Sequence, residues 1–178
     1  MFLSYLNETM DNPTNPTSGI RLAARVYWAP LGDHRHGGFT TDFEAAFPFL
    51  RKGTMQLISW TQLLAGDTWE WQENRMTAAR CLPGLPWHSL PTRQRLAGLA
   101  RFKRDLNGPF FLSLEAGATL DWETPAEIDQ SELAWGAGLS AGINTPMGPA
   151  TLSWGWSDEW HDRWTVSIGS PMTYGPGR

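Results

Sequence analysis

The sequence predicts an all-β protein, an antiparallel transmembrane β-barrel of about eight strands with one long inserted loop. Two observations predict this fold. Side chains alternate with period two along most of the 178 residues, and short turn-forming segments separate the alternating runs. Between Glu132 and Pro171, one face of the alternating runs is bulky and apolar, whereas the other is mostly glycine, serine, alanine and threonine. A sheet in water would carry Lys and Glu on that second face, so this pattern is typical of a membrane barrel. We expect residues 1–178 to form a single domain.

The alternation is clearest between Glu132 and Pro171, where two tight hairpins follow one another. The predicted outward residues are Leu133, Trp135, Ala137, Leu139, Ala141 and Ile143, then Leu152, Trp154 and Trp156, then Trp164, Val166 and Ile168. The predicted inward residues of the first run are Ala134, Gly136, Gly138, Ser140, Gly142 and Asn144. Small inward residues let another part of the chain approach this wall closely.

Residues 20–28 and 39–49 form a predicted hairpin with charges of both signs on its inward face. Its lumen-facing polar residues are Arg21, Arg25, Asp42 and Glu44, and Glu115 faces the lumen from a later strand at 110–120. We expect Arg25 to lie across the hairpin from Asp42 or Glu44, because opposite charges satisfy each other where water is scarce. A solvated sheet face is the alternative interpretation.

Periodicity is lost between residues 65 and 107, where prolines and glycines predict a long loop. The inward glycines leave one wall of a small barrel nearly bare, so we expect part of this loop, near Leu96 to Phe102, to fill the lumen. The alternative is an open sheet whose first and last strands, near Leu3 and Val166, pair with a second copy or a partner subunit.

Composition agrees with a membrane barrel and excludes several other classes. The 11 Trp suit the interface between headgroups and acyl chains, and the mean hydropathy of -0.36 is too low for a helical membrane protein. A net charge of -4 predicts no nucleic-acid partner. The single Cys81 excludes an internal disulfide. The N-terminal residues do not have the pattern of a signal peptide. Because an outer-membrane protein must be exported, we expect the sequence to be a mature form or a fragment.

Residues 140–149, together with Trp164 to Met172, are similar to the last barrel strands of the Omp85 superfamily, which includes BamA-like bacterial surface antigens and the barrels of patatin-like phospholipases. Residues 117–122 resemble the end of the strand before them. Residues 11–19 resemble an early Asp…Pro-Thr-x-Gly turn. Leu96, Ala97, Gly98 and Leu99 stand where the family has an inward-folded loop with an Arg-Gly-aromatic motif. In this sequence Ala97 stands in place of that arginine. The expected number of strands, about eight, is also half the number that is usual in the family.

The resemblance implies a non-enzymatic module of the bacterial outer membrane, in contact with its lipid and without a cofactor. Its role would be protein insertion or translocation at this membrane, or anchoring of a partner domain there. The alternatives are a barrel-embedded lipid hydrolase and a soluble β-sheet ligand binder, such as a Trp-rich sandwich.

Two short motifs point to other chemistry. Residues 138–142 match G-x-S-x-G, but Ser140 lies inside an alternating strand with no helix after it, unlike a hydrolase nucleophile. His34 and His36 could bind a metal, although no further ligands are recognisable nearby. We therefore expect neither a catalytic serine nor a metal site.

Overall fold

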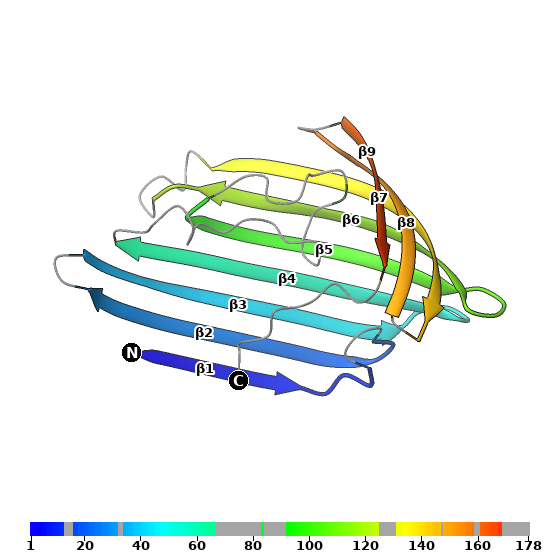
Figure 1. Ribbon diagram of the computed structural model, residues 1–178, viewed down its shortest axis with the longest axis horizontal. Helices are drawn as coiled ribbons and strands as arrows, with labels where there is room; N and C mark the ends of the chain where they lie inside the picture. The colour runs from blue at the N-terminus through cyan, green and yellow to red at the C-terminus, as the bar shows by residue number, and fades with distance from the viewer. Residues whose placement is uncertain are drawn as a thin grey trace.

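The chain folds into one antiparallel β-sheet of nine strands, in a computed structural model that describes residues 1–12, 16–31, 34–66, 83, 92–124, 131–146, 148–158 and 161–168. Each strand pairs with the next along the chain, in the order β1 to β9 (Figure 1). The strands are β1 (Phe2–Glu8), β2 (Gly19–Leu31), β3 (His34–Pro48), β4 (Gly53–Gly66), β5 (Gln94–Asp105), β6 (Phe110–Trp122), β7 (Glu132–Thr145), β8 (Gly148–Ser157) and β9 (His161–Ile168).

The all-β antiparallel prediction is confirmed, but the predicted long loop is wrong in its second half. Residues 94–105 form β5, which pairs with β4 and β6 within the sheet. The expected inward loop at 96–99 is therefore part of the wall, with Ala97 and Leu99 buried and Leu96 exposed. Alternation was hard to recognise here because Leu, Ala and Arg occur on both faces of β5.

The two faces of the sheet have the predicted composition. Large apolar side chains at alternate positions, such as Leu22, Leu114 and Leu139, are exposed on the face that we call the outer face. The opposite, inner face has Arg21, Asp42 and Glu44 in β2 and β3, and small residues in β7 and β8. Within the described residues only seven apolar side chains are buried, whereas 28 large apolar side chains are exposed. This distribution is the reverse of that of a water-soluble domain.

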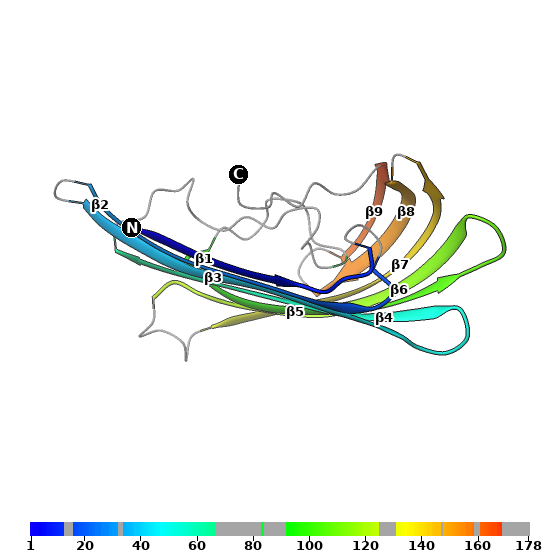
Figure 2. The ribbon, with the colours of Figure 1, turned by 90° about the horizontal axis from the view of Figure 1, so that it is seen from below.

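The sheet is a curved wall with two edges, as Figure 2 shows from below. Strands β8 and β9 turn across the end of the other strands in Figure 1. In the described part of the chain, β1 pairs only with β2 and β9 only with β8. Over the described ranges, the chain forms no helix long and apolar enough to span a membrane.

Candidate functional site: the polar inner face

Between described side chains, the inner face of β2 and β3 has one direct ion pair, and it is not the predicted one. Arg21 lies opposite Glu44, and its Nη2 atom is 2.7 Å from the Glu44 Oε2 atom. Arg25 instead lies opposite Thr40, with its guanidinium 5.2 Å from the ring centroid of Phe2. The prediction for Arg25 was wrong because the strands extend to Leu31 and His34, which changes the register of the hairpin.

Asp42 faces the same side from the middle of β3. It lies opposite Ala23 on one side and the buried Trp60 on the other. All four predicted polar residues of this hairpin therefore belong to the inner face.

Glu115 takes part in a chain of contacts that crosses the inner face. Arg101 donates from Nε to the Glu115 Oε1 atom at 2.8 Å and from Nη1 to the Gln56 Oε1 atom at 3.3 Å. The other end of that amide, Gln56 Nε2, donates to the Pro16 carbonyl at 3.1 Å. These contacts join β4, β5 and β6 to the connection between β1 and β2. The Gln56 amide and the Arg101 guanidinium thus both have partners, as burial requires.

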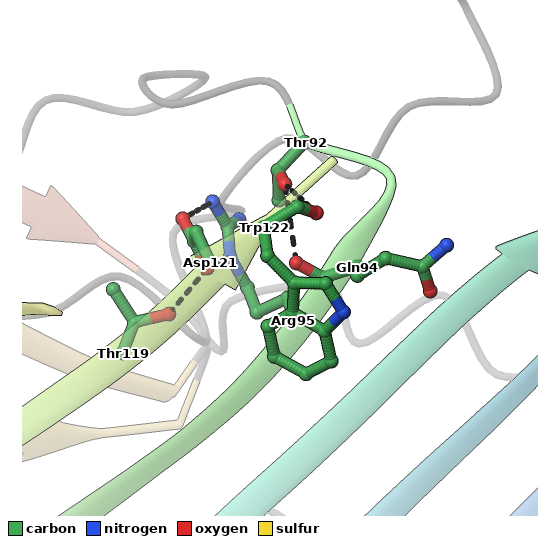
Figure 3. A network of polar contacts seen from close by, with 6 residues as sticks. All are labelled: Thr92, Gln94, Arg95, Thr119, Asp121 and Trp122. Carbon is green, nitrogen blue, oxygen red and sulfur yellow. Dashed lines mark hydrogen bonds and ion pairs between the residues drawn. The ribbon is translucent and has the colours of Figure 1, made fainter. Parts of the chain in front are cut away.

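The most deeply buried charge is Arg95, which sequence reasoning missed. Its side chain is 0% exposed and binds Asp121 through two bonds, Nε to Oδ1 at 2.8 Å and Nη2 to Oδ2 at 2.5 Å. Figure 3 shows that the two side chains meet from neighbouring strands, β5 and β6. Thr119 also donates to Asp121 Oδ1 at 2.9 Å, which fixes the carboxylate. Such a bidentate pair is geometrically specific.

Next to this pair, the side chains of Gln94 and Thr92 form hydrogen bonds to backbone groups near the ends of the strands. The Gln94 amide bonds both backbone groups of Leu64, with Nε2 2.5 Å from the carbonyl and Oε1 3.2 Å from the amide nitrogen. The Thr92 hydroxyl lies 3.1 Å from the Gln94 carbonyl and 3.3 Å from the Trp122 carbonyl (Figure 3). Both side chains satisfy backbone groups where the ladder ends.

Lys103 is a second buried cation on the inner face of β5. Its Nζ atom is 3.5 Å from Asp105 Oδ1 and 4.3 Å from the centroid of the Phe111 ring. The same ring covers Gly142, where an added Cβ would lie only 2.4 Å from Phe111 Cζ. Phe111 therefore fills part of the wall that the glycines leave bare.

Pro83 fills another part of that wall. A Cβ on Gly136 would meet the Pro83 carbonyl oxygen at 2.3 Å, and one on Gly138 would meet the Pro83 Cβ at 2.7 Å. The expected filler does come from the segment 65–107, but from Pro83 rather than from residues 96–102.

Hydroxyl groups pair across the remaining strands of the inner face. Ser140 bonds Ser153 at 2.9 Å between β7 and β8, and Thr151 bonds Ser167 at 2.5 Å between β8 and β9. In the described part of the chain, the Ser140 hydroxyl thus bonds a second hydroxyl, and Ser140 lies within β7 rather than on the sharp turn of a hydrolase nucleophile.

No metal site is recognisable among the described side chains, where no three His, Cys, Asp or Glu groups converge. Asp33 and the side chain of His34 lie outside the described residues. His36 is buried beside Tyr27, with the two ring centroids 6.2 Å apart.

Comparison of the sequence with protein-family models and with curated proteins found no match.

Proposed function

We propose that the sheet is the lipid-facing wall of a β-barrel in the bacterial outer membrane. The observation that supports this proposal is the exposed apolar outer face, which runs across all nine strands opposite a face of buried ion pairs. Lipid solvates such an outer face, whereas water would penalise it.

Strand length and aromatic residues agree with the proposal. Strands β2 to β7 have 12 to 15 residues, enough to cross the hydrocarbon layer, which needs about 9–11 residues in a tilted strand. Trp28, Trp135, Trp154 and Trp164 are exposed on the outer face. Indole rings favour the membrane interface, so exposed indoles on the outer face suit a wall that meets lipid.

We propose further that the wall is an Omp85-like module without catalytic chemistry of its own, as residues 140–149 and 164–172 suggest by resemblance. Its role would be insertion or translocation of proteins at the outer membrane, or anchoring of a partner domain. The polar inner face would then line the lumen.

The two faces give a direct test. Leu22→Arg would place a charge on the lipid side and should cost about 2–4 kcal/mol of unfolding free energy near the middle of the membrane. Ala23→Arg would place the same charge on the inner face, opposite Asp42, and should cost much less. Unfolding in urea, followed by tryptophan fluorescence in lipid vesicles, measures both. Equal tolerance at the two positions would refute the membrane assignment.

Closure of the barrel needs a separate experiment, because unpaired strand edges are not tolerated in lipid. We propose that the edges at β1 and β9 are satisfied either by each other or by a second copy or partner subunit. Cysteines at Leu3 and Val166, with Cys81 replaced by serine, distinguish the arrangements. Cross-linking within one chain indicates a closed nine-stranded barrel, and cross-linking between chains indicates a larger one.

A further inference from the structure

A hollow of about 500 Å³ lies on the outer face near the hairpin between β5 and β6. Its lining extends from that hairpin across β6, β7 and β8 to β9 and includes Leu106, Phe110, Leu112, Leu152, Val166 and Ile168. The hollow has the size of a small-molecule site, which usually occupies about 300–1,000 Å³. Its lining is mostly aliphatic and aromatic, with Thr151 and Ser167 as its hydroxyl residues and no charged residue.

An alkyl chain matches this lining. An apolar hollow does not hold ordered water, because water needs polar partners there. A flexible hydrocarbon chain would instead contact the wall along its length and gain dispersion energy at each contact.

A cation stands at one end of the hollow. Arg104 lies directly opposite Leu112, one of the lining residues, and is exposed on the same outer face. It has no hydrogen bond or ion pair within the described part of the chain, whereas Arg21, Arg95 and Arg101 on the inner face all bind carboxylates. An unpaired guanidinium beside an apolar groove is complementary to a ligand with an anionic head and a hydrocarbon tail.

The neighbouring turn brings more positive charge to this rim. Arg104 lies opposite Gly53, which directly follows Arg51 and Lys52. The two turns are tied together, because the Asp105 amide donates to the Lys52 carbonyl at 2.9 Å and Lys52 Nζ lies 3.3 Å from Asn107 Oδ1. Phosphate oxygens accept such cationic donors, and arginine can bind two of them at once.

We propose that this site binds one glycerophospholipid, with an acyl chain in the hollow and the phosphate at Arg104. The inference rests on the proposed membrane function and adds a defined lipid to it. Because the charge sits at the end of the sheet where the β3–β4 and β5–β6 turns are short, the headgroup would lie at that rim of the membrane.

Native mass spectrometry of the full chain in dodecyl maltoside tests the site, with palmitoyl-oleoyl phosphatidylglycerol as the probe. We expect one retained lipid per chain. Arg104→Gln should weaken its binding about tenfold or more, since it removes a charge-assisted hydrogen bond. Arg104→Lys should restore part of the affinity, and Ala141→Phe, which fills the hollow, should reduce binding with Arg104 intact. Arg163→Gln is the matched control, because it removes one positive charge from the inner face.

Unchanged binding in Arg104→Gln, or equal losses in Arg104→Gln and Arg163→Gln, would overturn the proposal. Equally tight binding of monoolein, which has no phosphate, would also overturn it. Failure here is distinguishable from failure of the membrane assignment. If Leu22→Arg and Ala23→Arg differ as expected while no lipid is retained, only the lipid site is wrong.

Discussion

The inner face is built in two different ways in the two halves of the sheet. In β2 to β6 long charged side chains reach across strands and pair, as Arg21 does with Glu44 and Arg101 with Glu115. In β7 to β9 glycines and short hydroxyl residues leave room, which Pro83 and Phe111 fill. Both arrangements limit voids and pair polar groups on a buried face. They do so incompletely, because within the described part of the chain His36 Nδ1 and Gln62 Nε2 are buried without a hydrogen-bond partner.

The two halves should therefore respond differently to mutation. A charged pair fails when one partner is removed, because the other charge stays buried. A close-packed glycine wall fails when a side chain is added, because backbone on both sides must move.

Removal of Arg95 should have the largest effect. Arg95→Met leaves the Asp121 carboxylate without its bidentate partner and should lower the free energy of unfolding by about 3–5 kcal/mol. Urea unfolding in lipid vesicles, followed by tryptophan fluorescence, measures the loss. The double variant Arg95→Met/Asp121→Leu should recover most of it, since it removes both buried charges. A loss below about 1 kcal/mol in the single variant would show that the pair is solvated after all.

Most of the fold, but less of the site, could be predicted from the sequence. The faces of β6, β7 and β8 follow directly from alternation of large and small residues, and the exposed Leu114, Leu139 and Trp154 agree. Strand β5 was missed because its inward positions include Arg95, Arg101 and Lys103, which resemble a loop until their partners on β4 and β6 are known.

Ion-pair partners could not be predicted because they depend on register. The link between β2 and β3 is much shorter than its Pro, Gly and His content indicates, since Leu31 pairs with His34. In that register Glu44 lies opposite Arg21 and forms an ion pair with it, rather than with Arg25. The Arg95–Asp121 pair could not be predicted either, because it joins β6, which the alternation predicted, to β5, which the alternation did not predict.

The glycine wall should be sensitive to added volume. Gly136→Ala would place a Cβ 2.3 Å from the Pro83 carbonyl oxygen and 2.8 Å from the Trp156 carbonyl oxygen. Both contacts are with backbone, so we expect a loss of about 1–3 kcal/mol in unfolding free energy. Ala137→Val on the exposed outer face is the control and should change it by less than about 0.5 kcal/mol. Similar values for the two variants would contradict close packing at Pro83.

A smaller effect is expected for the hydroxyl pair in the same half of the sheet. Ser140→Ala removes the 2.9 Å bond to Ser153 and should cost about 1 kcal/mol. Any hydrolysis of a fluorogenic ester by the preparation should be unchanged, because Ser140 has a structural role. Loss of turnover in a variant that still folds would instead favour a lipid hydrolase.

The smallest effect is expected for the connection between β1 and β2. The Pro16 carbonyl of this connection accepts a hydrogen bond from Gln56, which lies in the half of the sheet with the charged pairs. The carboxylate of Asp11 organises this connection. It accepts bonds from the Thr17 hydroxyl, from the Thr17 amide at 2.9 Å, from the Ser18 amide at 3.1 Å and from the Asn12 amide at 2.9 Å. These bonds, the Thr17 hydroxyl first among them, lower the pKa of Asp11 from 3.8 to about 2.

The sign of the pH dependence follows from the lowered pKa. Asp11 stabilises the turn fully above pH 3.8, its pKa without these bonds, and the contribution is lost as pH falls toward about 2. Amide NMR shifts of Thr17 and Ser18, in detergent micelles, should therefore titrate with a midpoint near pH 2 rather than near 3.8. Asp11→Asn should abolish this titration while the shifts of β7 stay unchanged. A midpoint near pH 3.8 would mean that the Asp11 carboxylate does not hold the turn. The position of Gln56 would then depend on its hydrogen bond with Arg101.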